Sequence, residues 1–408
     1  MTLPLTGFRV VELGTWVAVP AAAAMLADWG ATVVKAEAPS GDPLRSLHDT
    51  GFAAVEPPVN AVFQGENHSK HSMRFDLTRT DGRGRLLRLI EEADVFLTNL
   101  RSASLAKFGL TYPVLAAAHP RLVYAQLTGY GRTGPESDRA GYDYAAFWGR
   151  SGLLASMASD GQRPPSPRPG VGDHVAALAL CSGILAALLH RERTGLGQEV
   201  QVSLLASGRW ASAMDIHLEQ AVGPDRRPPN PLFALYRTAD DRWLQLMLGQ
   251  PERDWGRLCE ALGLDPTDAR FDSQDRRVEH VDELAELLES TLAREPLRTW
   301  ADRLDLAGVA WGPCETVASA LEDPQVRASC PPRLVRTTPP VPVIGNPVSL
   351  SGVARPGPAR PAGAGGVEGD DPPTLPAAPG LGEHDGRTWA ELEERRSTAG
   401  TGLERSSR

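Results

Sequence analysis

The sequence lacks the residue patterns that mark disulfide-rich, metal-binding and serine-dependent proteins. Its four cysteines, at positions 181, 259, 314 and 330, are far apart and form neither a CxxC pair nor a disulfide framework. Its nine histidines include no HExxH motif and no pair at i,i+4 spacing, so no metal site is expected. A Gly-x-Ser-x-Gly nucleophile elbow is also missing. Metal-dependent and serine-hydrolase chemistry are therefore unsupported.

A targeting signal and an excess of positive charge are missing too. The opening residues, MTLPLTGFRVVELG, pass directly into a strand pattern without the basic and apolar run of a secretory signal. The formal net charge of -9 argues against charge-driven binding to nucleic acid. Hydrophobic residues make up 41% and charged residues 23%, as in soluble globular proteins. We therefore expect a cytoplasmic protein that binds neither nucleic acid nor a membrane.

Alternating strand and helix patterns predict an α/β fold in the first half of the 408-residue chain. FRVVEL, from residue 8, is typical of a buried strand, AAAAMLADWG of a helix that ends at Gly30, and ATVVKAE of a second strand. The alternation recurs in RGRLLRLIEEA, DVFLTNL, YPVLAAAHP and RLVYAQLTGYG. Strands joined by helices lie parallel, so we expect a Rossmann-like domain with a parallel sheet.

The composition changes twice and predicts three parts. The stretch GPDRRPPNPLF separates the first domain from a hairpin, with Asp240 and Asp241 at its turn, and from amphipathic helices that indicate a smaller α+β domain. Residues 355–380 are rich in proline, glycine and alanine and predict an extended connector, followed by a short helix in RTWAELEERR and a frayed end. The expected boundaries are 1–222 for the large α/β domain, 223–330 for the small inserted domain and 331–408 for a segment that returns to the large domain.

One glycine motif has the spacing of a dinucleotide-binding loop without its context. Gly129, Gly131 and Gly134 in GYGRTG satisfy GxGxxG and follow a predicted strand. The next residues, PESDRAGYD, have no helical pattern, whereas such a loop needs a helix N-terminus to hold the pyrophosphate. We therefore expect no dinucleotide site here.

The stretch RPGVGDHVAALALCSGILAALLHRERTG, residues 168–195, combines a glycine-rich loop with an apolar helix. The pattern predicts a helix over residues 174–191. The run is interrupted by Ser182 and Gly183 and ends in charged residues, which favours a buried core helix over a membrane span.

Asp173 stands where that loop meets the predicted helix, and two interpretations are open. As an N-cap it would bond to the backbone N–H groups of the first turn, and periodicity alone favours this role. As a catalytic carboxylate it would use the freedom of Gly170 and Gly172 to admit a ligand, and the helix N-terminus to stay ionised. His174 is adjacent, but neighbouring side chains on a helix diverge, so a His/Asp dyad is not expected.

Taken together, several stretches resemble the class III CoA-transferases, the family of formyl-CoA transferase, carnitine CoA-transferase and α-methylacyl-CoA racemase. They cover nearly the whole chain in the family's order. The resemblance implies an interlaced homodimer, with a Rossmann-like large domain built from both ends of the chain and a small domain inserted between them. The similar stretches are LPLTGFRVVELGTWVAVPAAAAMLADWGATVVKAEAPSGDP, NHSK, LTNLRSASLAKFGL, RLVYAQLTGYGRTGP, GYDY, GVGDH, AALLHRERTGLGQEVQVSLL, GVAWGPC and PGLGEH.

The resemblance also implies a catalytic role for Asp173, because the aspartate of the family's Gly-Asp motif falls on it. Asp173 would attack an acyl-CoA thioester to give a mixed anhydride, and the released CoA thiolate would convert it to an aspartyl-CoA thioester that awaits an acceptor acid. Coenzyme A and acyl-CoA are then substrates, and no permanently bound cofactor or metal is implied. The implied CoA contacts are Val17, Ala18, Phe75, Asp76, Leu77, Thr78, Asn99, Leu100, Arg101, Lys107, Arg139, Ala140, Gly141 and Tyr142.

Departures from the family pattern narrow these expectations. Val17 stands where formyl-CoA transferases carry a glutamine, and Ala38 where they carry an arginine beside the adenine, so a bulkier acid is expected instead of oxalate or formate. Tyr142 replaces the histidine of the racemases, and a tyrosine with an ordinary pKa of about 10 is a poor acid–base partner. CoA transfer through Asp173 is the leading hypothesis. An α-methylacyl-CoA racemase or isomerase that uses Asp173 as acid and base, and a non-catalytic CoA-binding homologue, stay open.

Overall fold

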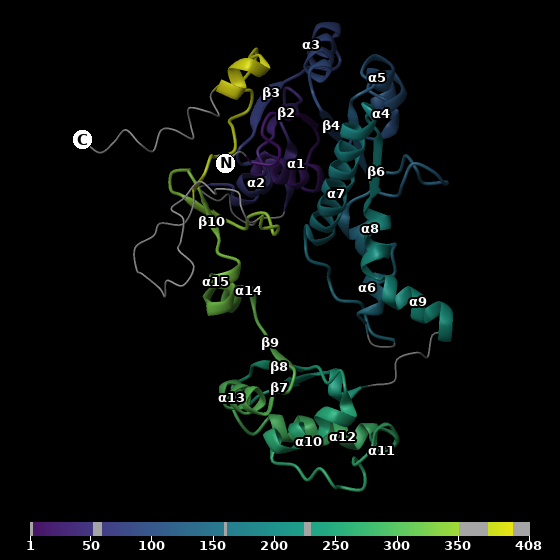
Figure 1. The fold of residues 1–408 in the computed structure, drawn as a ribbon, viewed down its shortest axis with the longest axis vertical. Helices are drawn as coiled ribbons and strands as arrows, with labels where there is room; N and C mark the ends of the chain where they lie inside the picture. The colour runs from purple at the N-terminus through teal and green to yellow at the C-terminus, as the bar shows by residue number, and fades with distance from the viewer. Residues whose placement is uncertain (1–2, 52–58, 159–160, 224–229, 351–373, 395–408) are drawn as a thin grey trace, which may run out of the picture. The chain divides into compact units, whose positions relative to one another are not determined.

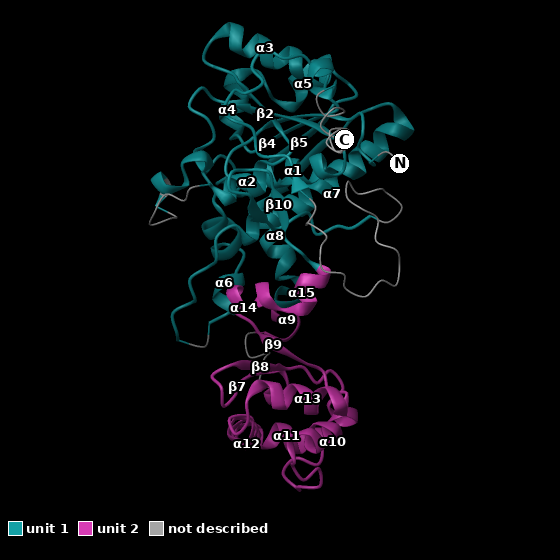
Figure 2. Ribbon diagram, turned by 90° about the vertical axis from the view of Figure 1, so that its left-hand side faces the viewer, with its two compact units in different colours: residues 1–216, 330–408 teal, residues 217–329 magenta. Residues whose placement is uncertain are grey.

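The structure is a computed structural model that describes residues 3–51, 59–158, 161–223, 230–350 and 374–394. The chain divides into two compact units, residues 1–216 with 330–408 and residues 217–329 (Figure 2). We call them unit 1 and unit 2. Most of the predicted linker after Gly223, residues 355–373 of the predicted connector and the C-terminal residues expected to fray lie outside the described residues.

Unit 1 is built on a six-stranded sheet in which every neighbouring pair of strands is parallel (Figure 1). The strand order is β3-β2-β1-β4-β5-β6. The strands are β1 (Arg9–Leu13), β2 (Thr32–Glu37), β3 (His71–Arg74), β4 (Val95–Thr98), β5 (Val123–Thr128) and β6 (Glu199–Ser203). This confirms the predicted α/β fold with a parallel sheet. Because both faces of such a sheet are covered, its inner strands β1, β2, β4 and β5 are buried on both sides, whereas the edge strands β3 and β6 carry more polar residues.

Helices cover both faces of this sheet. Alternate residues of the strands belong to different cores: Val10 and Val33 pack under α1 (Ala18–Asp28) and α7 (Val171–Thr194), whereas Val11 and Val34 face the other side. That second core is completed by α3 (Thr80–Glu91), α4 (Ser102–Phe108), α5 (Tyr112–Ala118) and the helical residues 389–394. The chain's late segment thus packs in the same core as its early strands.

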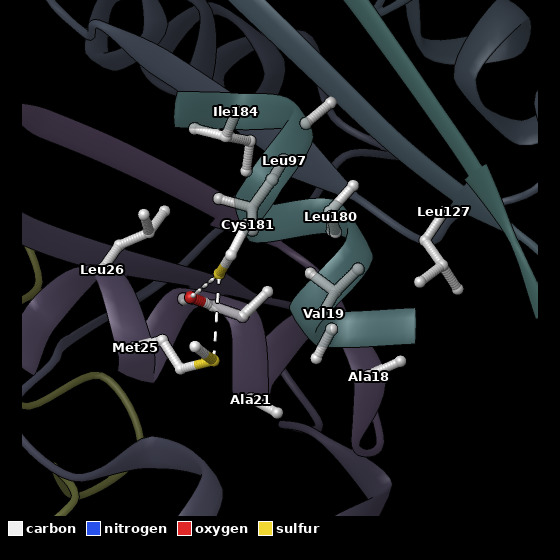
Figure 3. Close-up of a cluster of buried hydrophobic side chains, with 14 of the residues drawn as sticks. Ala18, Val19, Ala21, Met25, Leu26, Leu97, Leu127, Leu180, Cys181 and Ile184 are labelled. Carbon is white, nitrogen blue, oxygen red and sulfur yellow. Dashed lines mark hydrogen bonds between the residues drawn. The ribbon is translucent and has the colours of Figure 1, made fainter. Parts of the chain in front are cut away.

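Helices α1 and α7 pack closely because α1 is rich in alanine. The sequence AVPAAAAMLAD leaves only small side chains along most of α1, so the backbone of α7 approaches it closely. The thiol of Cys181 on α7 donates to the carbonyl oxygen of Ala22 at 3.3 Å and lies 4.0 Å from the sulfur of Met25 (Figure 3). This contact fixes the path of α7, whose N-terminus carries Asp173.

The prediction of a core helix in this region, in preference to a membrane span, is confirmed, although one face of the helix is exposed. Helix α7 is long and apolar enough to cross a membrane, but one side lies in the core with α1. The opposite side leaves Val171, Leu178, Leu185 and Leu189 exposed. These residues recur at spacings of seven and four, so they form one apolar stripe.

Unit 1 contains further elements around the sheet. A second, three-stranded sheet has the order β11-β10-β12, with β10 antiparallel to β11 and parallel to β12. The remaining elements are η1 (Pro43–Thr50), α2 (Ala61–Asn67), η2 (Tyr144–Gly149), α6 (Leu153–Ser156), α8 (Leu204–Ala211), β10 (Arg333–Val335), β11 (Val341–Val343) and β12 (Thr374–Leu375), while α9 (Ala213–Val222) begins here and continues into the next unit.

Unit 2 has an antiparallel sheet of β7 (Leu235–Arg237), β8 (Trp243–Leu246) and β9 (Trp311–Cys314). Asp241 adopts a positive φ of 61° between β7 and β8, which confirms the predicted hairpin turn. Trp300 lies in the core, where its indole N–H donates to the carbonyl oxygen of Leu292 at 2.8 Å. The helices are η3 (Pro231–Phe233), α10 (Pro251–Leu262), α11 (Gln274–Glu279), α12 (Val281–Leu292), α13 (Leu297–Ala307), α14 (Val317–Glu322) and α15 (Pro324–Ser329).

Alanine substitutions at two glycines inside helices should change the free energy of unfolding in opposite directions. A Cβ on Gly208 of α8 would lie 2.5 Å from the carbonyl oxygen of Phe147, so Gly208→Ala should lower the free energy of unfolding by about 1–3 kcal/mol. A Cβ on Gly256 of α10 would meet nothing within 4 Å, so Gly256→Ala should raise it by about 0.5–1 kcal/mol. Urea denaturation followed by circular dichroism measures both. Equal effects of the two substitutions would contradict this packing.

Candidate active site

A cavity of about 1480 Å³ lies in unit 1 at the carboxyl ends of the central strands. Thr15 to Ala18 after β1, Asn99 to Ser102 after β4, and Thr128 and Gly129 at the end of β5 contribute to its walls. Since β1 lies between β2 and β4, the connections from these strands lead away in opposite directions. Parallel sheets bind their ligands at such a switch point.

Asp173 lines this cavity from the first turn of α7 and is not its N-cap. The cap residue is Gly170, which has a positive φ of 76°, and the helix begins at Val171, three residues before the predicted start. The last residues of the predicted loop are helical in the structure. Gly172 lies in the first turn and packs tightly, since a Cβ there would lie 2.2 Å from the ring of Phe147. The N-cap interpretation of Asp173 is therefore wrong, and its carboxylate is available to the cavity.

A second carboxylate, that of Asp143, accompanies Asp173. Asp143 precedes η2 and is buried. Neither of its carboxylate oxygens accepts a hydrogen bond of ordinary geometry. The backbone N–H groups of Gly170 and Gly172 nevertheless lie close enough to lower its pKa. Burial outweighs them and raises the pKa of Asp143 to about 6. Burial, followed by the charge of Asp143, raises the pKa of Asp173 to about 7. The two groups thus form a carboxylate pair in which the charge of Asp143 disfavours the ionisation of Asp173.

His174 turns toward Glu66 and not toward Asp173. Its Nε2 lies 3.1 Å from Oε1 of Glu66, and its Nδ1 lies 2.7 Å from the carbonyl oxygen of Gly170. Two acceptors for two ring nitrogens favour the imidazolium, and the bond to Glu66 raises the pKa of His174 to about 9. As expected, no His174–Asp173 dyad forms. The positive charge of this imidazolium, one residue away from Asp173, lowers the pKa of Asp173 and so opposes its rise.

Most of the residues implied as CoA contacts lie around the same cavity as Asp173. They are Val17, Ala18, Asn99, Leu100, Arg101, Arg139, Ala140, Gly141 and Tyr142. Arg139 is also bonded to Glu136 at 2.8 Å and stacks on the ring of Tyr130.

Two groups of implied contacts are placed elsewhere. Phe75, Asp76, Leu77 and Thr78 line a second cavity of about 250 Å³, which shares Thr15 and Leu100 with the first. Lys107 lines neither cavity, although its ammonium lies 5.8 Å from the ring of Phe108, which lines the second. The structure therefore groups the implied contacts into two adjoining cavities and separates Lys107 from both.

Of the GYGRTG glycines, Gly129 serves backbone packing, whereas Gly131 and Gly134 have positive φ and no close neighbour at the Cβ position. Strand β5 ends at Thr128 and the next helical segment begins at Tyr144, so the helix that a dinucleotide loop requires is missing, as predicted. A Cβ on Gly129 would lie 2.5 Å from Cα of Gly141, so glycine at both positions lets the two segments touch. This contact places the Arg139 to Tyr142 segment over the cavity.

Asp143 and Glu66 were not predicted from the sequence as residues of the site. Asp143 stands beside Tyr142 in GYDY, so its signal was present in a stretch already singled out. Glu66 lies 108 residues from His174, and no local pattern joins them. Within the described ranges, no group of three or more His, Cys, Asp or Glu side chains is placed to hold a metal ion.

The raised pKa of Asp173 predicts a pH-dependent gain in stability when its charge is removed. Between pH 4 and 7 the unfolded chain releases this proton while the folded protein keeps it, so the wild type loses stability as the pH rises. Asp173→Asn cannot ionise. Its gain in the free energy of unfolding over the wild type should therefore be larger at pH 8 than at pH 5, as measured by urea denaturation.

Asp81→Asn is the matched control in the same unit. The hydrogen bond from Arg79 lowers the pKa of Asp81, so this exposed carboxylate is ionised at both pH values and its effect should not change between them. A difference between Asp173→Asn and the wild type that stays constant from pH 5 to 8 would show that Asp173 has an ordinary pKa.

Known proteins resemble this chain over most of its length. The sequence profile described as CoA-transferase family III matches residues 5–365. (R)-2-hydroxy-4-methylpentanoate CoA-transferase from Clostridioides difficile is 34% identical over 331 residues, covering 80% of this chain and 83% of that protein. Succinate–glutarate CoA-transferase from Agrobacterium fabrum is 32% identical over 336 residues, covering 80% and 83%.

A solved structure shares the fold over almost the whole chain. The crystal structure of a CAIB/BAIF family protein from Brucella suis superimposes with a TM-score of 0.77 at 28% identity, covering 96% of this chain and 100% of that one. The chain therefore belongs to CoA-transferase family III, the enzymes that transfer CoA between acyl-CoA thioesters and carboxylic acids.

Proposed function

We propose that this enzyme transfers CoA by way of a covalent intermediate on Asp173. The observation that carries the proposal is the position of this carboxylate: it lines the cavity at the N-terminus of α7, beside Asp143, with a pKa raised to about 7. A desolvated carboxylate of raised pKa is a better nucleophile when ionised than one in water. At neutral pH a large fraction of Asp173 is ionised.

The proposed reaction has two symmetrical halves. An oxygen of Asp173 attacks the thioester carbonyl of the donor, the C–S bond breaks, and a mixed anhydride and the CoA thiolate result. The thiolate attacks the aspartyl carbonyl, which releases the donor acid as a carboxylate and leaves aspartyl-CoA. The acceptor carboxylate attacks this thioester, its C–S bond breaks, and a second mixed anhydride and the CoA thiolate result. The thiolate then attacks the acceptor acyl carbonyl, which gives the acceptor acyl-CoA and restores the carboxylate of Asp173. The exchange of CoA between two carboxylic acids is near-thermoneutral. Because a protein carboxylate holds the acyl group in between, no water takes part and hydrolysis is avoided.

The surroundings of Asp173 fit these steps. The positive end of α7 and the imidazolium of His174 stabilise the ionised nucleophile, whereas burial and Asp143 prevent it from becoming too weak a base. The cations of Arg101 and Arg139 line the same cavity, and we propose that they bind the phosphates of CoA. The contribution of Phe75 to Thr78 and of Lys107 to CoA binding stays a prediction.

Trapping should find the covalent intermediate on Asp173. The protein is incubated with isovaleryl-CoA, phenylacetyl-CoA or succinyl-CoA and then with hydroxylamine or borohydride, and its peptides are mapped by mass spectrometry. A modified Asp173 is the expected result, because hydroxylamine attacks anhydrides and thioesters but not free carboxylates. Asp173→Asn should give no adduct, and the control Asp81→Asn should give the adduct of the wild type.

Other outcomes of the same experiment point to other functions. Solvent deuterium at the α-carbon of the acyl group without an adduct would contradict the transferase and indicate a racemase or isomerase that uses Asp173 as acid and base. Neither an adduct nor exchange with any acyl-CoA would indicate a homologue that binds CoA without catalysis.

We also propose that the enzyme acts as an interlaced homodimer in the cytoplasm. The apolar stripe of Leu178, Leu185 and Leu189 on α7 supports an interface with a second copy, because such a stripe is costly to expose to water. The four cysteines form no disulfide, and two of them are exposed, which supports a reducing compartment.

If the enzyme is a homodimer, its mass in solution should be twice the 43.7 kDa of one chain. Light scattering coupled to size exclusion measures this mass. Leu185→Glu should reduce it or prevent assembly, because a charge on the stripe would be buried without a partner. The control Leu306→Glu, at a site 91% exposed in unit 2, should keep the mass of the wild type. A wild-type mass of one chain at micromolar concentration would rule the dimer out.

A further inference from the structure

Trp16 has a backbone conformation that tryptophan rarely adopts. Its φ is +67°, in the left-handed region, which costs a bulky residue roughly 1–2 kcal/mol. Among the described residues other than glycine, only Ser69 and Asp241 also have positive φ. A residue held in such a conformation needs surroundings that enforce it, and such strain gathers at functional sites.

Hydrogen bonds of Thr15 and of the Trp16 N–H hold this conformation. The backbone N–H of Trp16 donates to Oδ1 of Asp42 at 3.1 Å, and the side chain of Asn99 bonds both the N–H and the carbonyl oxygen of Thr15, at 3.1 and 2.7 Å. Asp42 is itself anchored by the ammonium of Lys35 at 2.8 Å, with both side chains fully buried. The loop after β1 is therefore rigid, and the direction of the indole is fixed.

The indole of Trp16 forms part of the cavity wall beside Asp173. It meets the ring of Tyr142 edge to face, with centroids 6.3 Å apart and planes at 88°, and both residues line the cavity. A Cβ on Gly170, which caps α7, would lie 3.9 Å from Val17, the residue next to Trp16. The aromatic pair is thus held near the turn of α7 that carries Asp173.

The sheet order separates the charged wall of the cavity from its apolar wall. Arg101 follows β4 and Arg139 follows β5, on one side of β1. On the other side, η1 and α2 join β2 to β3 and contribute Leu44, Leu47 and Val62. Trp16, directly after β1, stands at the border between the two walls.

The apolar wall offers no unpaired cation among the described residues that line the cavity. Burial lowers the pKa of His68 to about 3, so this imidazole is neutral. His174 is paired with Glu66. Asp28 and Glu66 add negative charge on this side, although Asp28 is bonded to Arg333 at 3.0 Å. A second carboxylate on a substrate would be desolvated there without a partner.

We infer that Trp16 determines the specificity of the enzyme, and that the acyl group lies against Trp16 and the apolar wall formed by Leu44, Leu47 and Val62. The substrates are then bulky apolar monocarboxylic acids, branched or aromatic, and dicarboxylic acids are rejected. This inference rests on the proposed CoA transfer through Asp173. The charged wall with Arg101 and Arg139 is left to the phosphates of CoA.

Isotope exchange tests the inference without knowledge of the natural pair of acids. Each labelled acid is incubated with its own CoA thioester, so that one compound serves as donor and acceptor, and entry of label into the thioester is measured. Phenylacetate and isovalerate should exchange with kcat/KM values at least about a hundredfold above those of succinate and glutarate, because the second carboxylate finds no partner.

Trp16→Gly isolates the contribution of the ring. Glycine adopts a φ of +67° without cost, so the variant should keep the loop while it loses the indole. Its kcat/KM for phenylacetate relative to acetate should fall by about tenfold or more. Asp241→Gly is the matched control: it also replaces a residue of positive φ, at 61° in unit 2, and should leave the ratio unchanged.

The outcomes separate this inference from the proposed function. An adduct on Asp173 together with equal or faster exchange of succinate or glutarate overturns the substrate class alone. An adduct together with an unchanged phenylacetate to acetate ratio in Trp16→Gly overturns the role of Trp16. No adduct and no exchange with any acid overturns the covalent mechanism and this inference with it.

Discussion

The buried ion network of Glu12, Lys35, Lys70 and Asp42 holds the site together. Lys35 lies 2.7 Å from one oxygen of Glu12, Lys70 lies 2.7 Å from the other, and all three side chains are fully buried. With Asp42, two cations balance two anions. Loss of one member would leave an uncompensated buried charge, at a cost of about 3–5 kcal/mol. Because its members come from β1, β2 and the segments that flank η1 and α2, the network fixes the loop after β1 and the segment that carries the apolar wall of the cavity.

The carboxylate pair contrasts with this balanced network. Burial raises the pKa of both carboxylates, and the charge of Asp143 raises that of Asp173 further, at a place where neither has a guanidinium or ammonium partner among the interactions of the described residues. The helix end and His174 relieve the pair only in part. Such an arrangement lowers stability at neutral pH, and it is a common property of sites that perform chemistry. The protein thus balances its charges where it needs rigidity and leaves them unbalanced where it needs reactivity.

The sequence was sufficient to predict a parallel sheet, but not its strand β3 or the details of the site. Strands β1, β2, β4 and β5 are apolar runs closed by turn residues, and short-range patterns detect them. The start of α7 was missed because Gly170 and Gly172 are typical of a loop, whereas here one caps the helix and the other packs against Phe147. The bond between His174 and Glu66 joins residues 108 apart. Contacts of that range depend on the folded topology, which no local pattern contains.

The conformation of Trp16 connects the rigid network to the choice of substrate. Glycine would adopt the same φ without strain, and glycine is the usual residue at such positions. A tryptophan kept there costs backbone energy, which the hydrogen bond that its N–H donates to Asp42 offsets. The strain therefore has a purpose only if the indole itself is needed. Since its ring meets Tyr142 on the wall beside Asp173, the need lies in the cavity, where an aromatic edge contacts the acyl group while the loop backbone stays fixed.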